Sequence, residues 1–118
     1  MEINAALKAL AALAQDTRLR VFRMLVQAGP EGLAVGRIAE RLGTQANGRL
    51  SFHLKELVHA GLVTATPSGR FIFYAANYPV MNELLEYLTA YCCAGQSCGV
   101  EERGCHPAGS SIEGESRV

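Results

Sequence analysis

Residues 35–63 decide the fold, and they read VGRIAERLGTQANGRLSFHLKELVHAGLV. Apolar residues recur at helical spacing in two segments, residues 35–42 and residues 46–60, which end at Gly43 and Gly61. A short helix, a tight turn at a glycine and a longer second helix form the pattern of a helix-turn-helix. A helix is narrow enough to enter the major groove of DNA, so this pattern indicates a DNA-binding motif.

The segments that follow the motif change from a helical to an extended pattern. Residues 62–66 and 70–75 are rich in β-branched and aromatic side chains, and Pro67-Ser68-Gly69 between them predicts the turn of a β-hairpin. A hairpin directly after the second helix is the wing of a winged helix-turn-helix. The predicted fold class is therefore mainly α with one small β-hairpin, a winged helix-turn-helix.

Further helices are predicted on both sides of the motif. The first covers residues 3–14, and the second begins with Asp16 as its N-cap and ends at Gly29-Pro30. The last helix opens near Pro79, because proline is favourable in a first turn, and runs to about residue 91. Both the first and the last helix carry a continuous apolar stripe, which suits either a core or a subunit interface.

Length and composition limit the protein to one globular domain with a tail. The chain has 118 residues, of which 49% are hydrophobic, with 11 basic and 11 acidic side chains. We expect residues 1–92 to form the DNA-binding and dimerisation domain, and residues 93–118 to form a cysteine-containing tail that is disordered from about residue 107. No apolar run is long enough to span a membrane, and no signal peptide is recognisable, so a cytoplasmic protein is expected.

The charge of the chain is unevenly distributed. Between residues 35 and 78, five basic side chains face two acidic ones, a local charge of +3 that suits a polyanion. Asn and Arg have the best geometry for reading bases, while Ser and Lys commonly hold phosphates. A solvated helix face with an ordinary turn arginine is the alternative. The residues expected to contact double-stranded DNA are Asn47, Arg49, Ser51, His53 and Lys55 on the exposed face of the second motif helix and Arg70 at the hairpin tip.

At this point the sequence resembles a known family, the ArsR/SmtB repressors. The resemblance covers residues 7–91 and is most specific in Leu50-Ser51-Phe52-His53-Leu54-Lys55; the segments 14–20, 38–43 and 60–63 also carry it. These are small dimeric winged-helix proteins that leave their operators when a metal or metalloid binds. The resemblance implies that residues 46–60 read the operator and that the first and last helices form the homodimer interface.

The location of the inducer site differs among members of the family. The Cys-Val-Cys of the original arsenic repressors corresponds to Ala34, Val35 and Gly36, so that site is excluded. Zinc sensors of the family use Asp, His and Glu along the last helix, where this chain has Glu83 and Glu86 but no histidine. A subgroup of arsenic sensors carries a vicinal cysteine pair and a third cysteine after the last helix, and the segment from residue 92 to residue 98 is similar to theirs.

The chemistry of the cysteines supports the same site independently. All four cysteines lie in the last 27 residues, and Cys92-Cys93-x4-Cys98 places three thiols within seven residues. Trivalent arsenic is a soft centre that takes three thiolates in a pyramid, and Sb(III) has the same preference. The predicted inducer is therefore As(III), or Sb(III), bound by Cys92, Cys93 and Cys98, while Cys105 is expected to be a spectator. No organic cofactor is predicted.

Other roles for the cysteines stay open at the level of sequence. A four-ligand zinc site that includes Cys105 and His106 lacks the usual Cys-x-x-Cys spacing, and clustered exposed thiols also oxidise readily. A thiol-redox enzyme would need a nearby Lys or His to activate the nucleophile, and none is placed to do so. The sequence therefore predicts an arsenite-responsive repressor and not an enzyme, with another soft metal or thiol oxidation as the alternative signal.

Overall fold

The structure is a computed structural model, and it describes residues 1–95. Contacts divide the chain into a first compact unit, Met1–Leu84, and a second that begins at Leu85. The first unit contains α1 (Ile3–Leu13), α2 (Asp16–Ala28), β1 (Leu33–Ala34), α3 (Val35–Leu42), α4 (Gly48–His59), β2 (Val63–Ser68) and β3 (Phe71–Ala76). Helix α5 (Tyr78–Thr89) begins in the first unit, and a 3-10 turn, Cys92–Gly95, follows it in the second.

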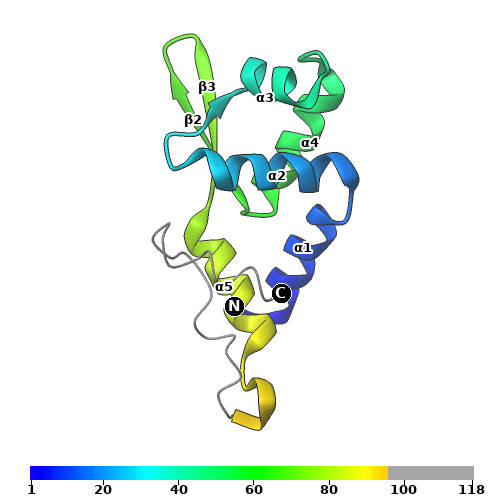
Figure 1. Ribbon diagram of the computed structural model, residues 1–118, viewed down its shortest axis with the longest axis vertical. Helices are drawn as coiled ribbons and strands as arrows, with labels where there is room; N and C mark the ends of the chain where they lie inside the picture. The colour runs from blue at the N-terminus through cyan, green and yellow to red at the C-terminus, as the bar shows by residue number, and fades with distance from the viewer. Residues whose placement is uncertain (96–118) are drawn as a thin grey trace. The chain divides into compact units, whose positions relative to one another are not determined.

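This element order confirms the predicted winged helix-turn-helix. Helices α3 and α4 form the helix-turn-helix, and the hairpin of β2 and β3 lies beside α3 in Figure 1. No helix within residues 1–95 is long and apolar enough to cross a bilayer.

The core of the first unit lies between α2, α3, α4 and the base of the wing. Its fully buried large side chains include Leu25, Ile38, Leu54, Leu57 and Leu62. Helix α1 packs against this core through alanines, because Ala6, Ala9 and Ala12 are its buried residues. The larger side chains of α1, Ile3, Leu7 and Leu10, are exposed.

The sheet has three antiparallel strands in the order β1-β3-β2. Strand β1 was not predicted; it has only two residues, and it forms because Leu33 and Ala34 pair with Tyr74 and Phe73 of β3. The position of the hairpin turn was also predicted wrongly. Pro67 belongs to β2, where it lies opposite Ile72, and the turn is made by Gly69 and Arg70. Proline is tolerated here because β2 is an edge strand.

The N-cap of α2 differs from the prediction by one residue. The side chain of Gln15, not of Asp16, caps the helix, because Gln15 Oε1 accepts a hydrogen bond of 2.9 Å from the backbone N–H of Arg18. Asp16 is the first helical residue and forms an ion pair with Arg20 one turn later. An acidic group in the first turn still complements the helix dipole.

Candidate nucleic-acid interface

The angle between α3 and α4 is set by a glycine turn. Gly43 has a left-handed backbone (φ +76°), and its N–H donates to the carbonyl of Glu40, while the N–H of Thr44 donates to the carbonyl of Ala39. This pair of bonds is a Schellman motif, which satisfies the last carbonyls of α3 and turns the chain sharply. Helix α4 can therefore start four residues later in a new direction.

Asn47 is the N-cap of α4. Its Oδ1 accepts a hydrogen bond of 3.0 Å from the backbone N–H of Leu50, so the side chain satisfies one of the orphan donors of the helix. The residue is exposed, but its oxygen is already engaged by the helix. The expected contact of Asn47 with DNA stays a prediction, and the structure adds a local role in starting the reading helix.

Three of the other predicted contact residues on α4 lie where the sequence placed them. Arg49, Ser51 and Lys55 are exposed along the helix, and Arg70 is exposed at the tip of the wing. Two positively charged side chains, Arg49 and Lys55, are thus exposed on the helix, and a third, Arg70, is exposed on the hairpin. Their contacts with phosphates or bases stay predictions.

The placement of His53 on the exposed face is wrong. Its side chain is only 9% exposed, because it shares the buried stripe of α4 with Leu50, Leu54 and Leu57. This spacing, i, i+3, i+4 and i+7, is that of a buried helix face, so the sequence carried the signal. His53 is therefore part of the packing beneath the reading helix, and DNA is not expected to reach it.

A polar cluster connects α4 to α2 around this histidine. Arg18 of α2 is largely buried and lies 3.9 Å from Glu56 of α4 between the guanidinium Nη1 and the carboxylate Oε1. Neither Arg18 Nε nor His53 Nδ1 has a hydrogen-bond partner among the described residues. Burial lowers the pKa of His53, and the charges of Arg18 and Arg49 lower this pKa further, against the opposing effect of Glu56. The histidine is therefore neutral at pH 7.

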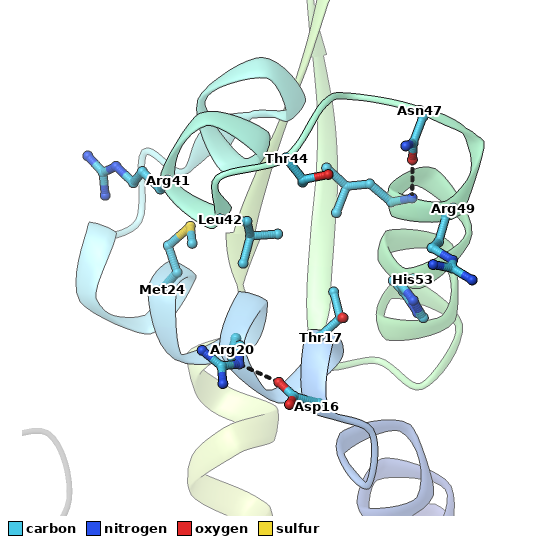
Figure 2. Close-up of a pocket in the computed structure, with 11 residues that line it drawn as sticks. Asp16, Thr17, Arg20, Met24, Arg41, Leu42, Thr44, Asn47, Arg49 and His53 are labelled. Carbon is cyan, nitrogen blue, oxygen red and sulfur yellow. Dashed lines mark hydrogen bonds and ion pairs between the residues drawn. The ribbon is translucent and has the colours of Figure 1, made fainter.

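A cleft of about 650 Å³ lies between α2, the end of α3 and the start of α4. Figure 2 shows Asp16, Thr17 and Arg20 of α2 on one side and Thr44 and Asn47 on the other, with a dashed line for the Arg20–Asp16 ion pair. The charged residues that line it are Arg20, Arg41, Arg49 and Asp16. This lining is net basic and adjoins the N-terminus of the reading helix, which suits a phosphate of the DNA backbone.

Phe52 is a residue on α4 that the sequence pattern did not single out. Its side chain is 53% exposed although it is a large apolar ring. It falls outside the stripe defined by Leu50, Leu54 and Leu57, and this offset is the signal that would have found it. The apolar Phe52 is therefore exposed and the polar His53 is buried, the reverse of what their polarity would suggest.

The two described cysteines lie directly after α5. Cys92 is half-buried and Cys93 is exposed in the 3-10 turn Cys92–Gly95, and neither forms a disulfide with a described residue. Within residues 1–95 there is no group of three or more potential metal ligands. The predicted third ligand, Cys98, and the predicted spectator, Cys105, lie outside the described residues.

Comparison with known proteins identifies the family. A helix-turn-helix domain family matches residues 13–65. HlyU from Vibrio cholerae N16961 is 33% identical, with a TM-score of 0.57 over 75% of this chain and 97% of HlyU. An ArsR-like transcriptional regulator from Rhodococcus sp. RHA1 is 27% identical, with a TM-score of 0.64 over 72% of this chain and 76% of the regulator. The chain belongs to the ArsR/SmtB family.

A third structure of this ArsR/SmtB group is named a "possible transcriptional regulator for arsenical resistance". It is 27% identical, with a TM-score of 0.60 over 71% of this chain and 83% of its own. No curated protein sequence matches the chain at a significant level. The relatives are transcription regulators and not enzymes, so this ArsR/SmtB member is a DNA-binding transcription regulator.

Proposed function

We propose that this ArsR/SmtB member is a cytoplasmic homodimeric repressor that As(III), or Sb(III), releases from operator DNA by binding the thiolates of Cys92, Cys93 and Cys98. The observation that carries the proposal is the adjacent pair Cys92-Cys93 in a short turn immediately after α5. One of these thiols is exposed and the other half-buried, so a solvated metalloid can approach both.

The backbone of this turn differs from that of a continuous α-helix. Tyr91, Cys93 and Ala94 all have φ between +53° and +58°, so the helical path of α5 is broken at the cysteines. Adjacent side chains on a continuous helix diverge by about 100°, which would separate the two thiols. A broken helix end removes this constraint, and Cys98 follows after only four further residues.

The start of α5 is bonded to the elements of the DNA-binding unit, so a structural change at the cysteines can be transmitted to them through this helix. The Tyr78 hydroxyl donates a 2.9 Å hydrogen bond to the carbonyl of Val26 near the end of α2. The N–H of Asn77 donates to the carbonyl of Leu62 just before β2, and Leu84 is buried in the core. A change in the direction of α5 would therefore act on both α2 and the base of the wing.

The proposed dimer uses α1 and α5, as the family resemblance implies. Helix α1 exposes Ile3, Leu7 and Leu10, and the part of α5 within the second unit exposes Leu85 and Leu88. Exposed apolar side chains at regular helical spacing are typical of subunit interfaces. A homodimer also places two reading helices for two half-sites of an operator.

The test is release of labelled promoter DNA, measured by fluorescence anisotropy with reduced full-length protein. We expect near-stoichiometric arsenite to release the wild-type protein and zinc to have no effect. Cys92→Ser should bind DNA with unchanged affinity but need at least about 10 times more arsenite for release, because two thiolates hold a soft centre more weakly than three. Cys105→Ser is the matched control and should respond like the wild type.

Each alternative has a distinct outcome in the same assay. Unchanged release of Cys92→Ser by arsenite would contradict the proposed ligand set. If arsenite leaves the complex intact while a thiol oxidant releases it and a reductant restores binding, the signal is oxidation and the arsenite proposal is wrong.

A further inference from the structure

Phe52 lies on the most outward line of α4. Each residue advances about 100° around a helix, which puts Phe52 roughly 200° from Leu50 at the centre of the buried face. Lys55 and His59 follow it three and seven residues later, on the same side of the helix, and both are exposed. Phe52 is therefore on the surface that α4 would insert into a major groove.

The neighbours of Phe52 do not form an apolar patch. Along α4 the side chains around it are Arg49, Ser51, Lys55 and Glu56, which are all polar or charged. Among the described residues its ring contacts one other ring, that of His53, at a centroid separation of 5.7 Å and an interplanar angle of 58°. Protein interfaces usually bury larger apolar areas, so a single ring among polar and cationic side chains does not suit a protein partner.

The major groove does offer an apolar partner for a single ring. Thymine carries a 5-methyl group there, and apolar side chains distinguish thymine through contact with this methyl group. The tilted packing on the buried His53 restricts the Phe52 ring, so less side-chain freedom remains to be lost on binding. Cationic residues on either side can hold the phosphates while the ring meets the base edge.

We infer that Phe52 is a specificity-determining residue that packs against the 5-methyl group of a thymine in each operator half-site. This inference rests on the proposed function only in its DNA-binding part, and it is independent of the inducer. It predicts that the protein distinguishes thymine from uracil, which has the same hydrogen-bonding edge but no methyl group.

The experiment begins with selection of an operator from random duplex DNA by the reduced full-length protein. Each deoxythymidine of the selected site is then replaced by deoxyuridine, symmetrically in both half-sites, and Kd is measured by anisotropy. We expect one position at which the wild type loses affinity about fifteenfold, which is about fourfold per half-site, the effect expected for one buried methyl group.

Variants of Phe52 assign this loss to the ring. Phe52→Ala should bind the thymine operator more weakly and show no further loss with uracil, while Phe52→Leu should retain part of the discrimination. Phe71→Ala, which removes a similarly exposed ring from the wing, should keep the wild-type ratio of the two Kd values. Ala and Leu favour helices, so α4 should persist in both Phe52 variants, which circular dichroism checks.

The outcomes separate this inference from the proposed function. If the protein selects an operator but no uracil substitution weakens binding, or if Phe52→Ala remains as sensitive as the wild type, the role of Phe52 is refuted and the repressor proposal stands. If no sequence is selected, sequence-specific operator binding fails and this inference fails with it.

Discussion

His53 occupies a position that its polarity disfavours. It lies on the buried stripe of α4 between Leu50 and Leu57, close enough to Arg18 and Arg49 for both charges to act on it. A charged imidazole in this position would add a third positive charge to a poorly solvated site. The packing of α4 on α2 therefore depends on a neutral histidine.

Stability should consequently decrease in mild acid through this residue. The pKa of His53 in the folded protein lies below its ordinary value of 6.5. As the pH falls below about 6.5, the unfolded chain binds the proton first, so the free energy of unfolding decreases until the pH passes the folded pKa. Urea unfolding at pH 7.5, 6.5 and 5.5 should show a steeper loss for the wild type than for His53→Gln.

The matched control for this experiment is His59→Gln, because His59 is exposed on the same helix. Its pH dependence should follow the wild type. Equal slopes for the wild type and His53→Gln would show that protonation of His53 does not oppose folding.

At the scale of single elements, periodicity predicted the five α-helices within residues 1–95, because each has an apolar stripe of two or more turns. The two errors in the sheet have the same physical cause, pairing with β3. Pro67 indicates a turn by composition, yet an edge strand tolerates it, and pairing with β3 extends β2 past it. Strand β1 has only two residues, too few to show a period, and its partners in β3 lie 39 and 41 residues away in sequence. Both features depend on pairing between strands that are distant in sequence, and local sequence patterns do not reveal such pairing.

Gly32 shows how tightly β1 is held against β3. Its backbone is left-handed (φ +78°), and an added Cβ would lie 2.4 Å from the carbonyl oxygen of Tyr74. Gly43 has nearly the same φ, +76°, but nothing lies within 4 Å of its Cβ position. A substitution at Gly43 therefore introduces backbone strain alone, whereas a substitution at Gly32 introduces both strain and a steric clash.

We expect Gly32→Ala to lower the free energy of unfolding by about 3 kcal/mol or more, because strain and displacement of the β3 backbone add together. Gly43→Ala should lower it by about 1 kcal/mol, the strain alone. Chemical denaturation of both variants provides the comparison. Equal losses would mean that β1 can move away from β3 without penalty.

At the scale of the whole molecule, the functional regions were predictable to different degrees. The sequence predicted which side chains of α4 are exposed, except at His53, which is buried, and at Phe52, which is exposed; contact of the exposed residues with DNA stays a prediction. The proposed inducer site rests on the chemistry of three clustered thiols, and one of them, Cys98, lies outside the described residues, so the site stays a prediction. The sequence alone does not identify the dimer interface, because an apolar stripe on a helix fits a core as well as a subunit interface.

The exposed apolar side chains of α1 are consistent with the proposed dimer interface and lead to a prediction. Leu7 is 56% exposed, while the alanines of α1 provide the packing within the first unit. Leu7→Glu should therefore leave each subunit folded but place two charges in the proposed dimer interface. Sedimentation velocity should show a monomer, and operator affinity should fall by about 10²-fold or more, because one subunit alone loses the avidity of two half-sites.

Leu19→Glu is the matched control, since Leu19 is 45% exposed on α2, outside the proposed interface. It introduces the same charge at a similar exposure and should remain a dimer. A dimeric Leu7→Glu variant with wild-type DNA affinity would place the interface elsewhere. If both variants are monomeric, the interface extends over α2, and arsenite release would have to act through α2 rather than through α1 and α5 alone.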